Sequence, residues 1–361
     1  MSYTSAWNNA TEMPVVTIGL DLGDRTSRIY EVSATAARLT EASVPTTPAA
    51  LATYFGKRAS CRVVLEVGTH SPWVARTLTE LGHEVIVANP SAVYGQGRRR
   101  KRNDRMDAEF LARQGRADVK LLHPIRHRSA AAQADLALLR ARDQLVQTRT
   151  GLINHVRGAV KAIGARLTRC AAEAFPRRVR AEVPEALRPA LTPLLEVIGE
   201  LSQRIAGYDR QLVAAIRDRH PVATRLQQPA GVGPLTALAY VLLVEDPQRF
   251  GRSRDVGAYF GLVPRLDESS DSRPQLRISK AGDSLGRRLL VSAAHYILGP
   301  FGPPCDLRRY GEALAARGGK NAKKRAVVAV ARKLAVLLHR LWVSETAYDP
   351  DYLATRPPRA A

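Results

Sequence analysis

Three short apolar segments separated by helical ones constrain the fold of this chain more than any other feature. PVVTIGLDLG (14–23), CRVVLEV (61–67) and HEVIVANP (83–90) each have the length and the β-branched content of a buried strand. SRIYEVSA (27–34) follows the first segment closely enough to be its hairpin partner. Strands that precede and alternate with helices predict an α/β layer fold, in which helices pack against a mixed sheet.

Helix signals fill the intervals between these strands. TPAALATYFG (47–56) has Thr47 in the N-cap position, Pro48 in the first turn and a glycine at its end. SPWVARTLTELG (71–82) predicts a second helix, and DRMDAEFLARQG (104–115) continues the basic run that follows the last strand. These segments supply the helices that would cover the sheet.

The middle of the chain, about 128–218, is almost purely helical in character. Apolar residues in its second half alternate spacings of four and three, as in a coiled-coil seam. They are Leu194, Ile198, Leu201, Ile205, Tyr208 and Leu212. Pro176 and Pro184 break the region, which predicts two long helices with a proline-rich connection. The seam fits an antiparallel hairpin that packs on itself and equally fits a coiled coil between two chains.

The third zone, about 219–345, opens with a glycine turn and closes with a basic helix. PAGVG (229–233) resembles a helix-hairpin-helix turn, in which the amides of Gly231 and Gly233 would contact a DNA phosphate. A tight turn between two core helices is the alternative. The helix predicted within 318–341 has four cations at its start, where positive charge opposes the helix dipole and favours a nearby phosphate. They are Lys320, Lys323, Lys324 and Arg325.

The charge of the chain predicts its partners. Lys and Arg number 55 against 33 Asp and Glu, a net charge of +22, and such an excess favours polyphosphates because binding them releases counterions. The sequence shows no signal peptide, no apolar run long enough to span a bilayer and no basic amphipathic anchor. Cys61, Cys170 and Cys305 lie far apart, which argues against a zinc site or a disulfide scaffold. We therefore expect a cytoplasmic protein without membrane contact, associated with the bacterial nucleoid when it acts.

The most basic run of the chain, RRRKRNDRMDAEF (98–110), contains two carboxylates. Its cations are predicted to hold nucleic acid: Arg98, Arg99, Arg100, Lys101, Arg102 and Arg105. Asp104 and Asp107 are three residues apart, so a helix would place them on one face. They could hold a divalent cation beside the nucleic acid, or they could balance charge on a solvated helix.

Two further carboxylates, Asp21 and Glu66, end predicted strands among apolar and glycine neighbours. A charge there is costly unless it is paired or binds metal, although strand-end residues often face solvent. Because strand ends on one edge of a sheet converge, these two and the aspartates of the basic run could form an all-oxygen site for Mg²⁺ or Mn²⁺. Two such ions could stabilise the attacking and leaving oxygens of a phosphodiester displacement.

The order GLDLG, LEVG and NDRMDAEFLA resembles the D-E-D-D core of ribonuclease-H-like (RuvC-like) nucleases. The segment 260–294, FGLVPRLDESSDSRPQLRISKAGDSLGRRLLVSAA, resembles the second domain of the DEDD-type transposases and recombinases of the IS110 insertion-sequence family. LQQPAGVGPLTA and QRFGRSRDVGAYFGLVP match that domain as well. The resemblance runs in collinear order from about residue 14 to 342, and the middle helices match only in character.

The resemblance implies a recombinase whose tetrad, Asp21, Glu66, Asp104 and Asp107, binds Mg²⁺ while Ser269 attacks a DNA phosphate. A covalent phosphoserine link preserves bond energy, so strands are exchanged rather than hydrolysed. The family usually has glycine after the nucleophile, whereas here Ser270 follows, so both serines remain candidates. Lys280 and Arg287 or Arg288 would neutralise the transferring phosphate, with a surface role as the alternative.

The resemblance also implies partners and a division into domains. The partners are the DNA of element ends and target, a structured bridge RNA encoded by the element, and further copies of the chain in a tetramer built from dimers, whose active site combines two domains from different subunits. The expected parts are a flexible N-terminus (1–12), a RuvC-like catalytic domain (13–125), a helical coiled-coil region (126–218), a C-terminal transposase domain with the serine loop (219–345) and a flexible tail (346–361).

Two other classes of function compete with this one. A RuvC-like endonuclease or junction resolvase would use the tetrad alone and hydrolyse DNA with water. The C-terminal domain argues against that class, because hydrolysis does not need the serine-bearing segment. A non-catalytic DNA- or RNA-binding protein held together by the coiled coil is the third class, and the intact tetrad argues against it.

Overall fold

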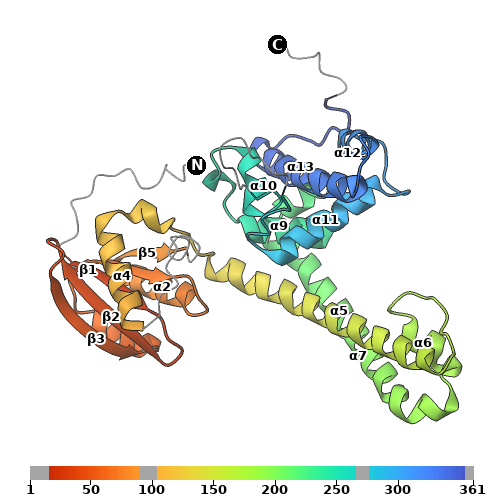
Figure 1. Cartoon of the computed structure of the whole chain (residues 1–361), viewed down its shortest axis with the longest axis horizontal. Coiled ribbons are helices and arrows are strands. Elements are labelled where there is room, and N and C mark those ends of the chain that lie inside the picture. The colour runs from red at the N-terminus through yellow and green to blue at the C-terminus, as the bar shows by residue number, and fades with distance from the viewer. Residues whose placement is uncertain (1–15, 90–103, 266–275, 354–361) are drawn as a thin grey trace. The chain divides into compact units, whose positions relative to one another are not determined.

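The computed structural model describes residues 16–89, 104–265 and 276–353 (Figure 1). Within α4, the side chains of Asp104 and Arg105 are outside the described part. The chain divides into two compact units, with the boundary between Ser129 and Ala130. They are called here the N-terminal unit and the C-terminal unit.

The N-terminal unit is built on a five-stranded mixed sheet of order β3-β2-β1-β4-β5. The strands are β1 (Val16–Asp21), β2 (Thr26–Ser33), β3 (Arg38–Pro45), β4 (Arg62–Glu66) and β5 (Glu84–Ala88). β1, β4 and β5 are parallel, whereas β1–β2 and β2–β3 are antiparallel. The three predicted strands and the hairpin partner are confirmed. The sequence did not predict β3, because RLTEASVP forms a mostly exposed edge strand with little apolar alternation.

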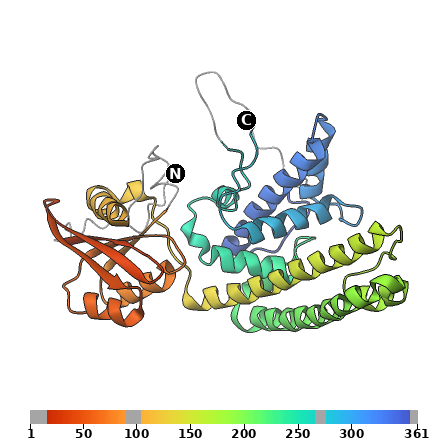
Figure 2. The ribbon, with the colours of Figure 1, turned by 60° about the horizontal axis from the view of Figure 1, so that its bottom comes forward.

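Helices cover both faces of this sheet (Figure 2). α1 (Pro48–Phe55) and α2 (Ser71–Glu80) pack on one face, and α4 (Asp104–Ala117) packs on the other, followed by the short helix η1 (Val119–Leu122). The predicted N-cap is confirmed, since the Thr47 side chain accepts a hydrogen bond from the amide of Ala50. Ile18, Leu20, Val63 and Leu65 fill the core on the α1–α2 face.

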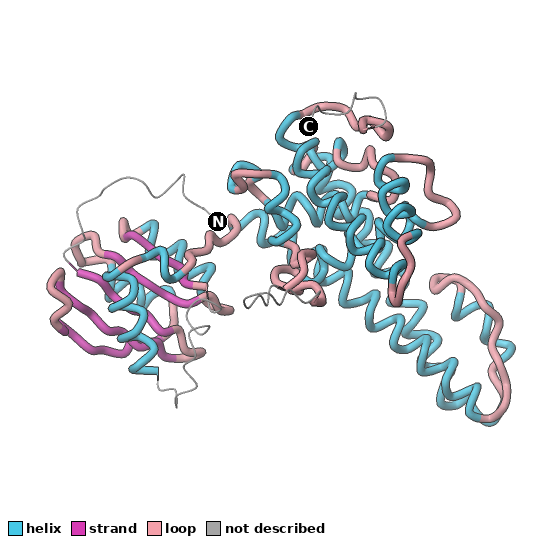
Figure 3. The backbone as a smooth tube through the Cα atoms, turned by 45° about the horizontal axis from the view of Figure 1, so that its top comes forward, coloured by secondary structure: helices cyan, strands magenta, loops and turns pink. Residues whose placement is uncertain are grey.

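The C-terminal unit begins with two long helices that lie side by side, α5 (Ala130–Ala162) and α7 (Arg188–Arg219) (Figure 3). Arg142 of α5 pairs with Asp209 of α7 at 2.7 Å, and farther along α5 the Nη1 of Arg149 donates to Ser202 Oγ at 3.1 Å. Contacts in this order require antiparallel helices. The hairpin within one chain is therefore confirmed, and a coiled coil between two chains stays a prediction.

The predicted proline-rich connection joins the two helices at the far end of the hairpin. It contains α6 (Phe175–Val179) and the short helices η2 (Arg180–Glu182) and η3 (Glu185–Leu187). Phe175 and Val179 are completely buried in a small core of their own, together with residues of both long helices. This end of the hairpin thus has a hydrophobic core separate from that of the C-terminal helices.

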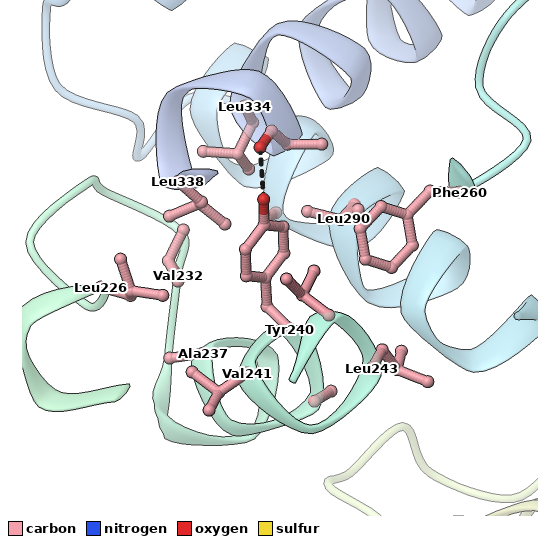
Figure 4. Packing of buried hydrophobic residues seen from close by; sticks show 14 of the residues in the cluster. Leu226, Val232, Ala237, Tyr240, Val241, Leu243, Phe260, Leu290, Leu334 and Leu338 are labelled. Carbon is pink, nitrogen blue, oxygen red and sulfur yellow. Dashed lines mark hydrogen bonds between the residues drawn. The ribbon is translucent and has the colours of Figure 1, made fainter. Parts of the chain in front are cut away.

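The remaining helices surround α9 (Pro234–Val244), in which every residue from Thr236 to Val244 is buried. They are α8 (Val222–Arg225), η4 (Pro247–Arg249), η5 (Ser253–Asp255), α10 (Val256–Tyr259), α11 (Ser284–Leu298), α12 (Asp306–Ala316) and α13 (Ala322–Ser344). Tyr240 lies at the centre of this core (Figure 4). Its hydroxyl donates a hydrogen bond to the carbonyl of Ala335 at 2.7 Å. Its ring stacks on the ring of Phe260, with 5.4 Å between the two ring centres. The basic helix predicted within 318–341 is confirmed as α13.

Part of the predicted flexible tail packs on α12 instead. The amide of Asp306 donates to the carbonyl of Pro350 at 2.8 Å, the amide of Leu353 donates to Asp306 Oδ2 at 2.6 Å, and Arg309 pairs with Asp351 at 2.6 Å. The tail contributes two backbone groups and the Asp351 side chain to these bonds. Residues 354–361 and the predicted flexible segment 1–12 lie outside the described residues.

In the described ranges, no helix is long and apolar enough to cross a membrane.

Candidate metal and nucleic-acid site

Asp21 and Glu66 end two adjacent parallel strands at the same edge of the sheet. Leu20 and Leu65 stand opposite each other in the β1–β4 register, so the two carboxylate residues that follow them are neighbours. Neighbouring strands are separated by about 4.8 Å. Both residues are half-buried. The predicted convergence of these two strand ends is therefore present in the backbone.

Both residues also face the side of the sheet that α4 covers. Side chains alternate along a strand, and Ile18 and Leu20 belong to the opposite face, so Asp21 shares the α4 side with Gly19. On β4, Val64 packs with Leu111 of α4. Glu66 lies two residues after Val64, so its side chain belongs to the same side of the sheet.

α4 runs so that its first turn lies at the carboxyl edge. A Cβ on Gly19 would lie 1.9 Å from the carbonyl oxygen of Ala108, which places this part of α4 on β1. Farther along the helix, Arg116 Nε donates to the carbonyl of Ser33 at 3.0 Å, and Ser33 pairs with Val16 at the amino end of β1. The positive end of the α4 dipole consequently points toward the edge where the strand carboxylates lie.

This direction brings Asp107 toward the strand carboxylates. Asp107 immediately precedes Ala108 and is half-buried. Asp104 is the first residue of α4, and its side chain lies outside the described part. Among the side chains that the structure does describe, no three His, Cys, Asp or Glu form a group that could hold a metal ion. The fold thus gathers the backbone positions of Asp21, Glu66, Asp104 and Asp107 at one edge of the sheet.

The donor set fits a hard divalent cation. Carboxylate oxygens are the ligands that Mg²⁺ and Mn²⁺ prefer, and parallel strand ends in α/β sheets commonly carry such sites. Carboxylates held close together repel one another, and a bound cation relieves this repulsion. Asp21, Glu66, Asp104 and Asp107 are the residues that would hold the ion.

A histidine and an aspartate at the same edge were not predicted. His70 lies in the turn after β4 and Asp24 in the turn after β1, with 3.6 Å between His70 Nε2 and Asp24 Oδ1. Trp73 Nε1 donates to His70 Nδ1 at 3.1 Å, which leaves Nε2 to carry the proton of a neutral ring. The sequence could have indicated them, because His70 and Asp24 follow directly after two strands whose ends converge.

The two candidate serines lie outside the described residues, but the root of their loop is described. The amide of Arg265 donates to the carbonyl of Arg277 at 3.0 Å, and the amide of Ser279 donates to the carbonyl of Val263 at 2.8 Å. Pro264 and Ile278 form a bridge between these bonds. A short antiparallel ribbon therefore brings together the two ends of the segment 266–275 that contains Ser269 and Ser270.

Arg287 binds the backbone at this root. Its Nη1 donates to the carbonyl of Phe260 at 3.2 Å and to that of Ala281 at 3.1 Å. Gly261 has a φ of +65°, and a Cβ there would lie 2.2 Å from the Ala281 carbonyl oxygen. Lys280 is exposed in a left-handed conformation and donates its amide to the Gly261 carbonyl at 3.1 Å. Arg287 is thus tied to the root, whereas the Lys280 side chain faces solvent; phosphate binding by either stays a prediction.

Arg288 has a different partner, on the hairpin. It pairs with Asp143 of α5 at 2.7 Å, and nearby Arg140 of α5 pairs with Asp283, the N-cap of α11, also at 2.7 Å. Burial alone would raise the pKa of Asp143, but the hydrogen bond and charge of Arg288 outweigh burial and hold that pKa below its usual value. The hairpin is thereby fastened to the helix that follows the serine loop.

The two glycines of the PAGVG turn have different roles. Gly231 has a φ of +82°, and a Cβ on it would lie 2.8 Å from the carbonyl oxygen of Ala293, so packing on α11 already requires glycine there. Gly233 is the N-cap of α9, and a Cβ on it would meet open space. The tight-turn alternative explains the first glycine, and DNA contact through the second stays a prediction.

The remaining predicted cations divide by position. Lys323 and Lys324 are exposed in the first turn of α13. Arg98, Arg99, Arg100, Lys101 and Arg102 lie outside the described residues, and so does the side chain of Arg105.

Two family models match this chain. Residues 18–164 match the DEDD model of IS110 elements, described as "Transposase", and residues 223–306 match the model described as "Transposase IS116/IS110/IS902 family". Similar proteins include the "Probable family 20 transposase" of Pseudomonas aeruginosa, 32% identical over 82% of this chain and 88% of the relative. The "Transposase for insertion sequence element IS1111A" of Coxiella burnetii is 32% identical over 81% of this chain and 80% of its own length. The corresponding protein of IS1328 in Yersinia enterocolitica is 31% identical over 65% and 70%.

Proposed function

Because the chain belongs to the IS110 family of insertion-sequence transposases, a family of DNA-recombining enzymes, we propose a specific chemistry for it. The reaction is a Mg²⁺- or Mn²⁺-dependent cleavage and exchange of DNA strands through a serine nucleophile, guided by a structured RNA that the element encodes. The observation that best supports this proposal is the position of Asp21 and Glu66 at one sheet edge, beneath the first turn of α4.

The covalent step exchanges one phosphodiester for another. The hydroxyl of Ser269 loses its proton, its Oγ forms a bond to the DNA phosphorus, and one P–O bond of the DNA breaks. The departing strand takes a proton and leaves as a hydroxyl. In the second step, a hydroxyl of another strand attacks the same phosphorus and releases the serine, so no bond energy is lost to water. A divalent ion bound by the tetrad would stabilise the charge on the oxygens around the phosphorus.

The charged residues of the chain have separate roles in this proposal. The cations from Arg98 to Arg105 hold nucleic acid beside the tetrad, and Lys280 neutralises the transferring phosphate. Lys323 and Lys324 at the exposed start of α13 and the amide of Gly233 bind the DNA backbone. The active assembly contains several copies of the chain.

A covalent adduct tests the serine. The protein is incubated with Mg²⁺, the RNA that copurifies with it and a DNA that carries the element junction, and the denatured products are examined for DNA attached to protein. Peptide mass mapping then identifies the attached residue. We expect the adduct on Ser269, and we expect Ser269→Ala to abolish it while Ser270→Ala retains it.

Other outcomes separate the competing functions. An adduct on Ser270 would reassign the nucleophile. Nicked DNA without any adduct would indicate the hydrolytic RuvC-like nuclease. Intact DNA that is bound by the protein, in the presence of each metal ion in turn, would indicate the non-catalytic class. Omission of the RNA tests the guide, because a guided enzyme should lose cleavage of the junction DNA without it.

A further inference from the structure

The positive charge of the helical hairpin is concentrated at its tip. The hairpin tip, residues 155–188, contains eight Lys and Arg against three Glu. The two shafts that lead to it, 130–154 and 189–219, together contain seven Lys and Arg against six Asp and Glu. The tip therefore carries nearly all of the net charge of the hairpin.

The tip is a folded module that presents its cations on a fixed scaffold. Arg157 donates to the carbonyls of Leu167 at 3.2 Å and Thr168 at 3.0 Å, and its guanidinium lies 4.9 Å from the centre of the Phe175 ring. Glu182 accepts a hydrogen bond from the amide of Thr168 at 2.7 Å. These bonds and the buried core fix the connection against the ends of both long helices.

Four arginines of the tip are exposed and unpaired. They are Arg166, Arg169, Arg177 and Arg178, and none of their side chains makes a hydrogen bond or ion pair with any residue in the described ranges. In α6 the reason is geometric: Phe175 and Val179 face the core, so the two arginines between them face outward.

Five of the seven cations of the shafts are instead held in ion pairs with residues in the described part of the chain. Arg142 pairs with Asp209 at 2.7 Å, and Arg219 pairs with Asp135 at 2.6 Å. Unpaired cations held close together repel one another, and a polyanion relieves this repulsion. Guanidinium groups match phosphate oxygens with two parallel hydrogen bonds, which makes arginine well suited to phosphate. The single Phe, Tyr or Trp of the tip, Phe175, is buried, so stacking on bases is not available there.

We propose that the hairpin tip binds the sugar-phosphate backbone of nucleic acid, independently of base sequence, as a contact separate from the catalytic edge. Residues 165–222 lie outside both family matches, so neither match accounts for this cluster. The ligand is a phosphodiester polyanion, which either DNA or the guide RNA can supply. The proposal requires no cleavage and holds whichever serine, or water, attacks the phosphate.

A matched pair of double variants of the full chain tests the proposal. Arg177→Gln with Arg178→Gln removes two exposed charges from the tip, and Arg204→Gln with Arg210→Gln removes two exposed charges from the shaft. Affinity is measured against salt concentration with a chelator present, so that no strand is cut. One probe is a random-sequence duplex DNA, and the other is a stem-loop RNA with the same number of phosphates.

The slope of affinity against salt decides the outcome. The slope is that of the logarithm of the binding constant against the logarithm of salt concentration, and each lost phosphate contact on duplex DNA reduces its magnitude by about 0.9. The slope of the tip variant should therefore be smaller than that of the wild type by up to about 1.8, whereas the slope of the shaft variant should equal that of the wild type. If the tip variant has a reduced slope on the RNA probe alone, RNA supplies the phosphates that the tip binds. If its slope is reduced on the duplex alone, DNA supplies them. Slopes equal to wild type on both probes, or equal losses in both variants, would overturn the proposal. Unchanged circular dichroism of both variants verifies their folding.

Discussion

Gly19 of β1 faces the backbone carbonyl of Ala108 in α4 so closely that a Cβ on Gly19 would lie 1.9 Å from that oxygen. The contact is between backbones, so no side-chain rotation can relieve it. Gly19→Ala should therefore displace α4 or lower the free energy of unfolding by about 1–3 kcal/mol, the usual range for overpacking. Urea unfolding followed by circular dichroism measures this change.

Gly151→Ala on α5 is the control for that variant. A Cβ at Gly151 meets open space within a helix, where alanine is favoured over glycine by about 0.5–1 kcal/mol. We expect this variant to be as stable as the wild type or slightly more stable. Equal stability of the Gly19→Ala protein would show that α4 does not press on β1 as described.

Removal of a strand-end carboxylate should abolish cleavage and spare binding. Asp21→Asn or Glu66→Gln keeps the side-chain shape but weakens a cation ligand, and a loss of about 4 kcal/mol of transition-state stabilisation corresponds to about a thousandfold slower reaction. Cleavage of junction DNA in Mg²⁺ and DNA affinity in a chelator are measured on the same preparations. Glu41→Gln, on the edge strand β3, should cleave at the wild-type rate. Wild-type cleavage by Asp21→Asn would remove this residue from the site.

Arg287 should act by positioning the serine loop and not by binding phosphate. Its guanidinium holds the carbonyls of Phe260 and Ala281 at the root of that loop. Because a displacement of about 1 Å can slow a reaction about a hundredfold, Arg287→Ala should slow adduct formation by roughly that factor without weakening DNA binding. Arg287→Lys should restore only part of the rate of adduct formation, because an ammonium group is a single point charge and cannot reproduce the planar set of donors of the guanidinium group.

The competing role of Arg287 has a different signature. A phosphate ligand at this position would make Arg287→Ala bind DNA more weakly and with a smaller salt dependence, alongside the slower reaction. Equilibrium binding of junction DNA over a range of salt concentrations distinguishes the two roles.

Acid should weaken the base of the hairpin through Asp135. Hydrogen bonds from Arg219 and, secondarily, from His220 hold the pKa of Asp135 below its usual value despite burial. A depressed folded-state pKa stabilises the folded protein above the unfolded value of about 3.9, and this contribution disappears as the pH falls through the folded value. Asp135→Asn should lose about 1 kcal/mol at pH 7, because Arg219 is half-exposed and solvent screens the pair.

The comparison with wild type over pH tests this assignment. The difference in free energy of unfolding between the two proteins should begin to shrink below about pH 4, where the carboxylate of the unfolded wild-type chain takes up a proton, and should disappear as the pH falls through the lower pKa of the folded state. A difference that stays constant from pH 7 to pH 3 would show that Asp135 contributes through packing and not through its charge.

Periodic elements of the fold could be predicted because their sequence patterns are local. The buried strands of the α/β unit, the Thr47 cap and the two long helices each follow from spacing and cap residues. β3 could not be predicted in the same way, because its partner β2 holds it by hydrogen bonds while most of its side chains face solvent. The hairpin was one of two alternatives, since the same seam can be buried within a chain or between chains.

The candidate site was predictable to the level of the sheet edge. Strand ends converge by geometry, so the strand pattern alone is enough to group Asp21 with Glu66. The direction of α4, which brings Asp107 to that edge, depends on the close packing of Gly19 on Ala108, a contact between segments far apart in sequence. The attachment of Arg287 to two carbonyls depends likewise on tertiary packing, so the sequence pattern alone could not predict it.

The ribbon at the root of the serine loop has a consequence for how this enzyme can change. Its hydrogen bonds between Arg265 and Arg277 and between Val263 and Ser279 already join the two ends of the loop. Doubling the length of a loop with joined ends costs only about 0.6 kcal/mol of closure entropy. Insertions and deletions between these ends should leave the surrounding helices folded, so the segment that contains Ser269 and Ser270 can diversify while the rest of the domain is preserved.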